Sequence, residues 1–186
     1  MEELNNENKR KMTIDIAKLS KTIILLTLLI FIVAFGPFCL IWHDGGHALL
    51  SVFSSFTNLI ILLVAQILGL AVHELIHGIT WACFSKNGFR SISFGIFWKQ
   101  FMPYCHCSDP LKIRYYIIGA LMPCFLLGIM PVVVAYCISN ASLLIFGALF
   151  IAAALGDILI VWTIRKENVD SMVIDHPSEP GCYIID

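Results

Sequence analysis

Several features of soluble or nucleic-acid-binding proteins are missing from this chain. It has no basic patch that would indicate a nucleic-acid partner, no low-complexity segment, and no internal repeat of roughly 20–50 residues. The net charge of -1 gives no information about partners. The first 21 residues are polar, and no small-x-small cleavage site follows the first apolar run. We therefore expect no signal peptide and a first apolar run that is retained.

A disulfide framework is also missing. The seven cysteines are scattered, and most of them lie in or beside apolar runs. That placement is typical of small buried side chains rather than of paired cysteines. An odd count leaves at least one thiol unpaired within the chain.

Apolar residues, by contrast, are abundant. They make up 59% of the 186 residues, and the mean hydropathy is +0.85. Typical soluble domains are about 45–50% apolar. Four stretches, 22–42, 56–84, 115–138 and 141–164, are long enough to cross a hydrocarbon layer of ~30 Å. The sequence predicts an all-α multi-pass membrane protein with four transmembrane helices.

The basic residues predict the orientation. All 12 Lys and Arg precede the first stretch, lie between the second and third, or follow the fourth. The loops 43–55 and 139–140 have none. By the positive-inside rule, both termini are cytoplasmic and the protein lies in the cell membrane. We divide the chain into a cytoplasmic N-terminal segment (1–21), a four-span membrane domain (22–164) and a cytoplasmic C-terminal tail (165–186).

The segment 90–107 lies between spans two and three, and we do not expect it to be a span. Polar and apolar side chains alternate from Ser91 to Phe94, and the segment is rich in aromatic and β-branched residues. This pattern indicates a β-hairpin. We expect its turn near Lys99-Gln100 and its place at the cytoplasmic face. Residues 92–97 could offer an edge strand to an extended substrate, or could simply pack at the interface.

Within the second span, His73-Glu74-Leu75-Ile76-His77 forms an HExxH motif. Residues four apart lie on one helix face, about 6 Å apart along the axis. His73 and His77 can therefore hold one zinc ion, while Glu74 reaches the water that attacks the substrate. Ionisable groups are costly in hydrocarbon, which favours a functional site. A structural hydrogen-bonded cluster is the alternative.

Asp157 is the other ionisable carboxylate within the spans. It precedes Arg165 by eight residues, or about 12 Å of helix, and His77 precedes Lys86 by nine, or about 13 Å. The two groups thus come to similar depths in the inner half of the bilayer. Two histidines and a carboxylate are a common catalytic zinc set, so we predict one zinc ion per chain on His73, His77 and Asp157, with Glu74 as the general base. Alternatively, Asp157 serves a polar contact between helices.

This pattern resembles the site-two-protease-like intramembrane metalloproteases, which carry HExxH on one span and an aspartate ligand two spans later. More closely, the chain is similar to a small bacterial family of unknown function, the putative zincin peptidases, over about residues 56–183. The residues that carry this similarity are His73–Gly78, Pro110 to Pro123, Gly156-Asp157 and the tail 175–181. The resemblance implies a metalloprotease.

We therefore expect a zinc-dependent membrane metallopeptidase that cleaves peptide bonds at or within the membrane. Its partners would be membrane lipid and a peptide or membrane-protein substrate, and the chain could form a homo-oligomer. One alternative is a non-enzymatic membrane protein whose metal site serves structure, sensing or transport. Another is a hydrolase of lipid or of a non-peptide amide.

Other polar groups favour plainer interpretations. His43 and His47 flank two glycines, which predicts a polar turn rather than a helix. The Cys105-His106-Cys107 sequence lacks a second ligand pair, which favours an interfacial loop. His176 is expected to be a solvated tail residue rather than an extra ligand. Gln66 is seven residues before His73 and could bond a ligand, line a water path or bridge two helices.

Overall fold

The computed structural model describes residues 9–97, 102–177 and 179–185 and is mostly helical. The chain forms two compact units. The first contains the described residues up to Ala17 together with Glu74–Met122 and Gly156–Asp186, and the second contains Lys18–His73 and Pro123–Leu155. The boundary passes through one continuous helix between His73 and Glu74, so that helix contributes to both units.

Four helical segments are long and apolar enough to span a membrane, as predicted. They are Lys18–Ile41, Phe56–Phe84, Ile113–Ile138 and Ala141–Ile164. The first belongs to α1 (Ile16–Ile41) and the second is α3 (Phe56–Phe84). The long uninterrupted apolar runs explain the agreement, because the length of a membrane span can be predicted from the length of its apolar run.

The third and fourth segments are not regular helices. In the third, α4 (Ile113–Pro123) passes into a π-helical turn, η3 (Cys124–Ile129), and then α5 (Met130–Ile138). The missing N–H groups of Pro123 and Pro131 remove hydrogen bonds that a regular helix would make there. In the fourth, α6 (Ala141–Ala153) and α7 (Leu155–Ile164) are separated at Ala154.

A short helix, α2 (Gly45–Ser54), follows α1. The prediction that two glycines would prevent a helix here is wrong, because Gly45 and Gly46 form its first turn. A side chain on Gly45 would lie 2.8 Å from the carbonyl oxygen of Phe38. Glycine therefore permits the close approach of α2 to the end of α1.

The predicted hairpin is present. Strand β2 (Ile92–Phe97) pairs antiparallel with β3 (Met102–Cys107), following the short helix η2 (Gly88–Ser91). The expected turn residues Lys99-Gln100 lie outside the described residues. Ile92 and Phe94 pack against Gly78 of α3, the residue after His77. This contact favours the packing interpretation of the hairpin, and its place at a membrane interface stays a prediction.

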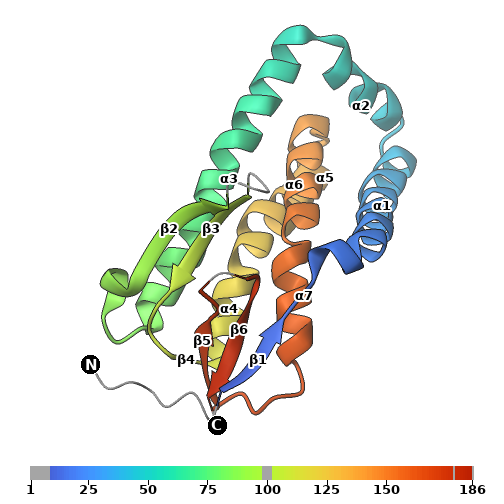
Figure 1. Ribbon diagram of the computed structural model, residues 1–186. Helices are drawn as coiled ribbons and strands as arrows, with labels where there is room; N and C mark the ends of the chain where they lie inside the picture. Colours follow the sequence, from blue (N-terminus) through green and yellow to red (C-terminus); the bar gives the residue numbers. More distant parts are fainter. Residues whose placement is uncertain (1–8, 98–101, 178, 186) are drawn as a thin grey trace. The chain divides into compact units, whose positions relative to one another are not determined.

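An all-α description is incomplete, because the first unit also contains a four-stranded antiparallel sheet (Figure 1). Its order is β1-β6-β5-β4, with β1 (Lys9–Thr13), β6 (Gly181–Ile185), β5 (Met172–Asp175) and β4 (Leu111–Lys112). Both segments outside the predicted spans, 1–21 and 165–186, therefore supply strands to one sheet. The ends of the chain meet there, since Lys9 pairs with Ile185.

Each unit has its own core. In the first, the buried side chains of Val173 and Ile184 on the sheet cluster with Trp81 of α3, Tyr116 of α4 and Ile164 of α7. In the second, a cluster of small and apolar residues joins α1, α2, α5 and α6. The first core matters for the site, because it contains the helix turn that follows His77.

Candidate metal centre

Helix α3 carries three of the predicted site residues. His73 and His77 are buried, with 5% and 3% of their surface exposed, and Glu74 is half-buried. An imidazole is rarely retained at such low exposure unless its nitrogens have partners. Both histidines therefore require polar neighbours or a ligand.

The neighbours of His77 separate the roles of its two nitrogens. Its Nδ1 lies 2.9 Å from the carbonyl oxygen of Gly119 on α4. A carbonyl can only accept, so Nδ1 carries the proton and donates it. In the neutral imidazole, the lone pair is then on Nε2, the atom that lies 3.6 Å from Oδ2 of Asp157. This is the arrangement that a metal-binding histidine usually has.

Asp157 lies in the first turn of α7, just after the interruption at Ala154. Its side chain is 25% exposed. Ligand atoms of His73, His77 and Asp157 all lie within 4.8 Å of one another. In tetrahedral zinc coordination, two ligand atoms each about 2.0–2.1 Å from the ion are roughly 3.3 Å apart. The donor types fit a zinc ion, and the 3.6 Å between His77 Nε2 and Asp157 Oδ2 is close to that separation. The limit of 4.8 Å for the whole group is wider, so the ligands must draw together to share one ion.

An aromatic ring lies against each histidine. Trp81 stacks on His77 with ring centroids 5.1 Å apart, and Phe150 of α6 stacks on His73 at 6.2 Å. A glycine accommodates each aromatic ring. A side chain on Gly119 would overlap Nε1 of Trp81, and one on Gly69 would overlap the Phe150 ring. These contacts restrict how the two imidazoles can rotate.

The other candidate ligands do not join this group. In the part of the chain that the structure describes, His73, His77 and Asp157 are the one set of three or more His, Cys, Asp or Glu residues close enough to share an ion. His47 lies in α2. His176 is buried in the tail, where its Nδ1 accepts the backbone N–H of Glu179 at 2.9 Å, so the expectation of a solvated side chain is wrong.

The cysteines of the hairpin are poorly suited to bind metal. Burial raises the pKa of the Cys105 and Cys107 thiols, and the negative charge of Asp175 raises both further. Metal ligation requires the thiolate, which such a shift disfavours. The charge of Glu74 also contributes to the shift at Cys105. These features favour the loop interpretation of Cys105-His106-Cys107.

Gln66 is less simply explained. Its Nε2 is buried without a hydrogen-bond partner among the described residues. The amide therefore does not use this atom to bridge two helices. An unsatisfied buried amide costs about 1–3 kcal/mol, and water or a bound molecule would remove that cost.

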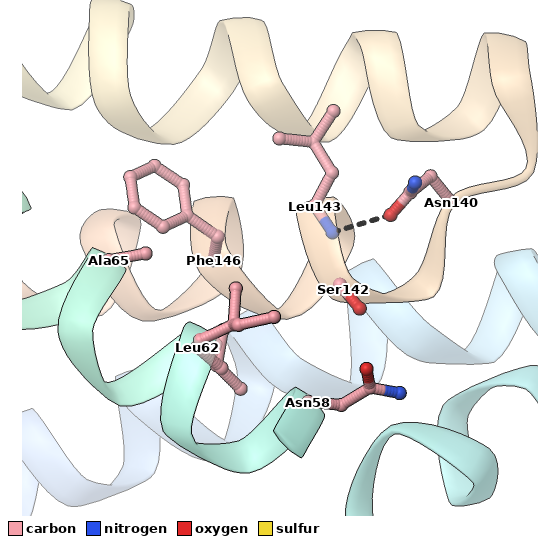
Figure 2. Close-up of a pocket in the computed structure, with 8 residues that line it drawn as sticks. Asn58, Leu62, Ala65, Asn140, Ser142, Leu143 and Phe146 are labelled. Carbon is pink, nitrogen blue, oxygen red and sulfur yellow. Dashed lines mark hydrogen bonds between the residues drawn. The ribbon is translucent and has the colours of Figure 1, made fainter. Parts of the chain in front are cut away.

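A pocket of about 390 Å³ lies in the second unit, away from the sequence motif (Figure 2). Its lining is largely apolar, with the amides of Asn58 and Asn140 and the hydroxyl of Ser142 as its polar groups. Leu62 of α3 and Phe146 of α6 both line it, and Oδ1 of Asn140 caps α6 by accepting the N–H of Leu143 at 2.9 Å. None of the predicted site residues lines this pocket.

Sequence reasoning did not find the groups that support the histidines. Trp81 could have been found, because it follows His77 by four residues and so shares its helix face. Phe150 carries no such signal. Gly119 acts through its carbonyl oxygen, which every residue possesses, so no side-chain pattern could point to it.

With this geometry established, comparisons with known proteins define the class. Residues 66–172, more than half of the chain, match the family described as "Putative zincin peptidase". The chain belongs to this family, which confirms the resemblance noted in the sequence. The matched region contains the HExxH motif and Asp157. No curated protein and no solved structure matches the chain.

Proposed function

We propose that this protein is a zinc-dependent, membrane-embedded metallopeptidase that hydrolyses peptide bonds at or within the membrane. The observation that carries the proposal is the convergence of His73, His77 and Asp157 within 4.8 Å beside the glutamate of an HExxH motif. Membership of the zincin family supports a zinc peptidase. The link to site-two proteases rests on the order of motifs alone.

The membrane part of the proposal rests on the four long apolar helices. Large apolar side chains of α1 and α3 are widely exposed, for example Leu40 at 87% and Ile61 at 62%. Exposed apolar surface on this scale is unfavourable in water and favourable against lipid. The one-sided distribution of Lys and Arg supports cytoplasmic termini.

In the proposed mechanism, His73, His77 and Asp157 hold the ion and Glu74 moves protons. A bound zinc ion supplies Lewis-acid polarisation of the scissile carbonyl and makes water more acidic. Glu74 accepts the proton of the attacking water as the C–O bond forms. It then donates that proton to the amine as the C–N bond breaks. The Gly119 carbonyl keeps His77 in the Nδ1–H tautomer throughout.

The first prediction concerns Glu74. Glu74→Gln should leave about one zinc ion per chain and lower peptide cleavage by at least about 100-fold, because general base catalysis is lost while the ligands remain. Zinc content and chelator-sensitive cleavage of a membrane-inserted peptide would be measured on purified protein. Glu167→Gln, at an exposed ion pair with Arg10, is the matched control.

Wild-type turnover by Glu74→Gln would exclude the catalytic role of this residue. If the wild type holds zinc that His73→Ala loses, but cleaves no peptide, then a structural, sensing or transport role of the site is favoured instead. Absence of zinc from the wild type at neutral pH would contradict both the zinc peptidase and the non-enzymatic metal site.

A further inference from the structure

Asp175 is a buried carboxylate that the proposed reaction does not use. It ends β5, and its side chain is 9% exposed. Burial raises its pKa, while the hydrogen bond from the Cys107 N–H and the nearby Tyr116 hydroxyl favour the charged form. The Cys107 bond is 2.8 Å long, and Nδ1 of His106 lies 3.9 Å away. Such a group persists in a core only where its hydrogen bonds are satisfied.

From Asp175, a column of rings leads to the candidate metal centre. The Tyr116 hydroxyl lies close enough to Asp175 to favour its charged form. The Tyr116 ring stacks on Trp81 at 5.3 Å, and Trp81 stacks on His77 at 5.1 Å. Trp81 Nε1 also donates to the backbone oxygen of Tyr116 at 3.1 Å. Every member of this column lies in the first unit.

The same face of α4 supplies the acceptor for His77. Tyr116 and Gly119 are three residues apart, so they lie on one side of the helix. Tyr116 accepts from Trp81, and Gly119 accepts from His77. A shift of Tyr116 would therefore move both acceptors relative to α3. Because Asp175 holds the outer end of the tyrosine, it restrains that shift.

The tail is built to hold Asp175 in place. In the sheet, Asp175 of β5 is paired with Cys182 of β6. In the connection between the two strands, the N–H of His176 donates to the Gly181 oxygen at 3.0 Å, and His176 stacks on Tyr183. Asp175 lies beyond residue 172, where the family match ends.

We propose that Asp175 is a positioning residue of the metal centre, which anchors Tyr116 and through Trp81 and α4 orients His77 toward the ion. The proposal rests on the proposed function, since it assigns the tail a part in the same site. It predicts that the C-terminal strand influences metal affinity without contacting the metal.

The test compares Tyr116→Phe, which removes the hydroxyl and keeps the ring, with Asp175→Ala in the full-length protein. Each should weaken zinc binding by about tenfold, the lower end of the effect of removing an outer partner of a metal-binding histidine. The double variant should bind zinc no more weakly than either single variant, because both substitutions remove the same contact between Asp175 and Tyr116. Asp170→Ala, in an exposed ion-pair cluster just before β5, is the control.

A second measurement is independent of zinc and of cleavage. In metal-free protein, ¹⁵N chemical shifts of histidine report the tautomer of His77. Tyr116→Phe should reduce the population with the proton on Nδ1, and Asp170→Ala should not. Zinc affinities within twofold of wild type, additive losses in the double variant, or an unchanged His77 tautomer in Tyr116→Phe would each overturn the proposal. A wild type that binds no zinc would defeat the proposed function, and the same tautomer measurement on metal-free Asp175→Ala would still decide the role of Asp175.

Discussion

At the scale of single residues, the two histidines of the motif are held in different ways. His77 has a hydrogen bond to a main-chain carbonyl and a stacked indole. His73 is stacked on the phenyl ring of Phe150, which fits against Gly69. The helix alone sets the spacing of the two imidazoles, but these neighbours set their rotation. Rotation decides which nitrogen faces the ion.

A substitution at Gly119 tests this support. In Gly119→Ala, the added methyl group would overlap Nε1 of Trp81, so either the indole or α4 must move. We expect the His77–Gly119 hydrogen bond to be lost and zinc affinity to fall about 10–100-fold, measured by chelator competition. Gly36→Ala is the control, since no atom lies within 4 Å of its added methyl group. Equal affinities in the two variants would show that the Gly119 contact does not orient the ligand.

Residue chemistry explains what sequence reasoning could find at the site. HExxH and Asp157 were identifiable because ionisable groups are so scarce in the spans and because helix rise converts residue number into depth. The structure brings that group together, and its role as a metal site stays a prediction. The column from Asp175 to His77 was not identifiable, since it joins three segments, β5, α4 and α3, that only the fold brings together.

At the scale of elements, the long helices were predictable and their irregularities were not. The bounds of α3 follow its apolar run, from Phe56 to Phe84. The helix is interrupted at Ala154, which places Asp157 in the first turn of α7. No proline lies near this interruption in the chain, so the sequence does not predict it. Nor does β1 have a local signal. Its Lys-Arg-Lys sequence becomes a strand through pairing with β6, at the far end of the chain.

The attachment of β1 can be tested through its ion pair. Arg10 donates two hydrogen bonds to Glu167, of 3.2 and 2.8 Å. Arg10→Glu places like charges together and should lower the free energy of unfolding by about 0.2–1 kcal/mol, the range for exposed pairs. The exchange Arg10→Glu with Glu167→Arg should recover most of that loss, as measured by thermal unfolding in detergent at low salt. Failure of the exchange to recover any stability would argue against this contact.

At the scale of the whole molecule, the sheet places the two ends of the chain together. Strands β1 and β6 are neighbours, so residues 9–13 and 181–185 must lie on the same side of any membrane that the helices cross. Four crossings satisfy that condition, whereas an odd number would not. From the charge distribution we propose that this is the cytoplasmic side.

Accessibility in intact cells tests this topology. An epitope inserted at His43, between α1 and α2, should bind antibody on intact cells. Epitopes at either terminus should bind only after the membrane is permeabilised. A terminal epitope that is accessible on intact cells would contradict the proposed orientation, and a difference between the two termini would contradict an even number of crossings.

The pairing of β1 with β6 also imposes an order on biosynthesis. The ribosome makes β1 before the four long helices and β6 after them, so this part of the sheet cannot close until β6 has been translated. Closing so long a loop is entropically costly and slow unless the intervening segments are already fixed. Asp175 reaches its place beside Tyr116 only at this late stage. A chain that stalls or is truncated before its last strand would carry all four helices and the HExxH motif, yet should lack the completed support of its metal centre.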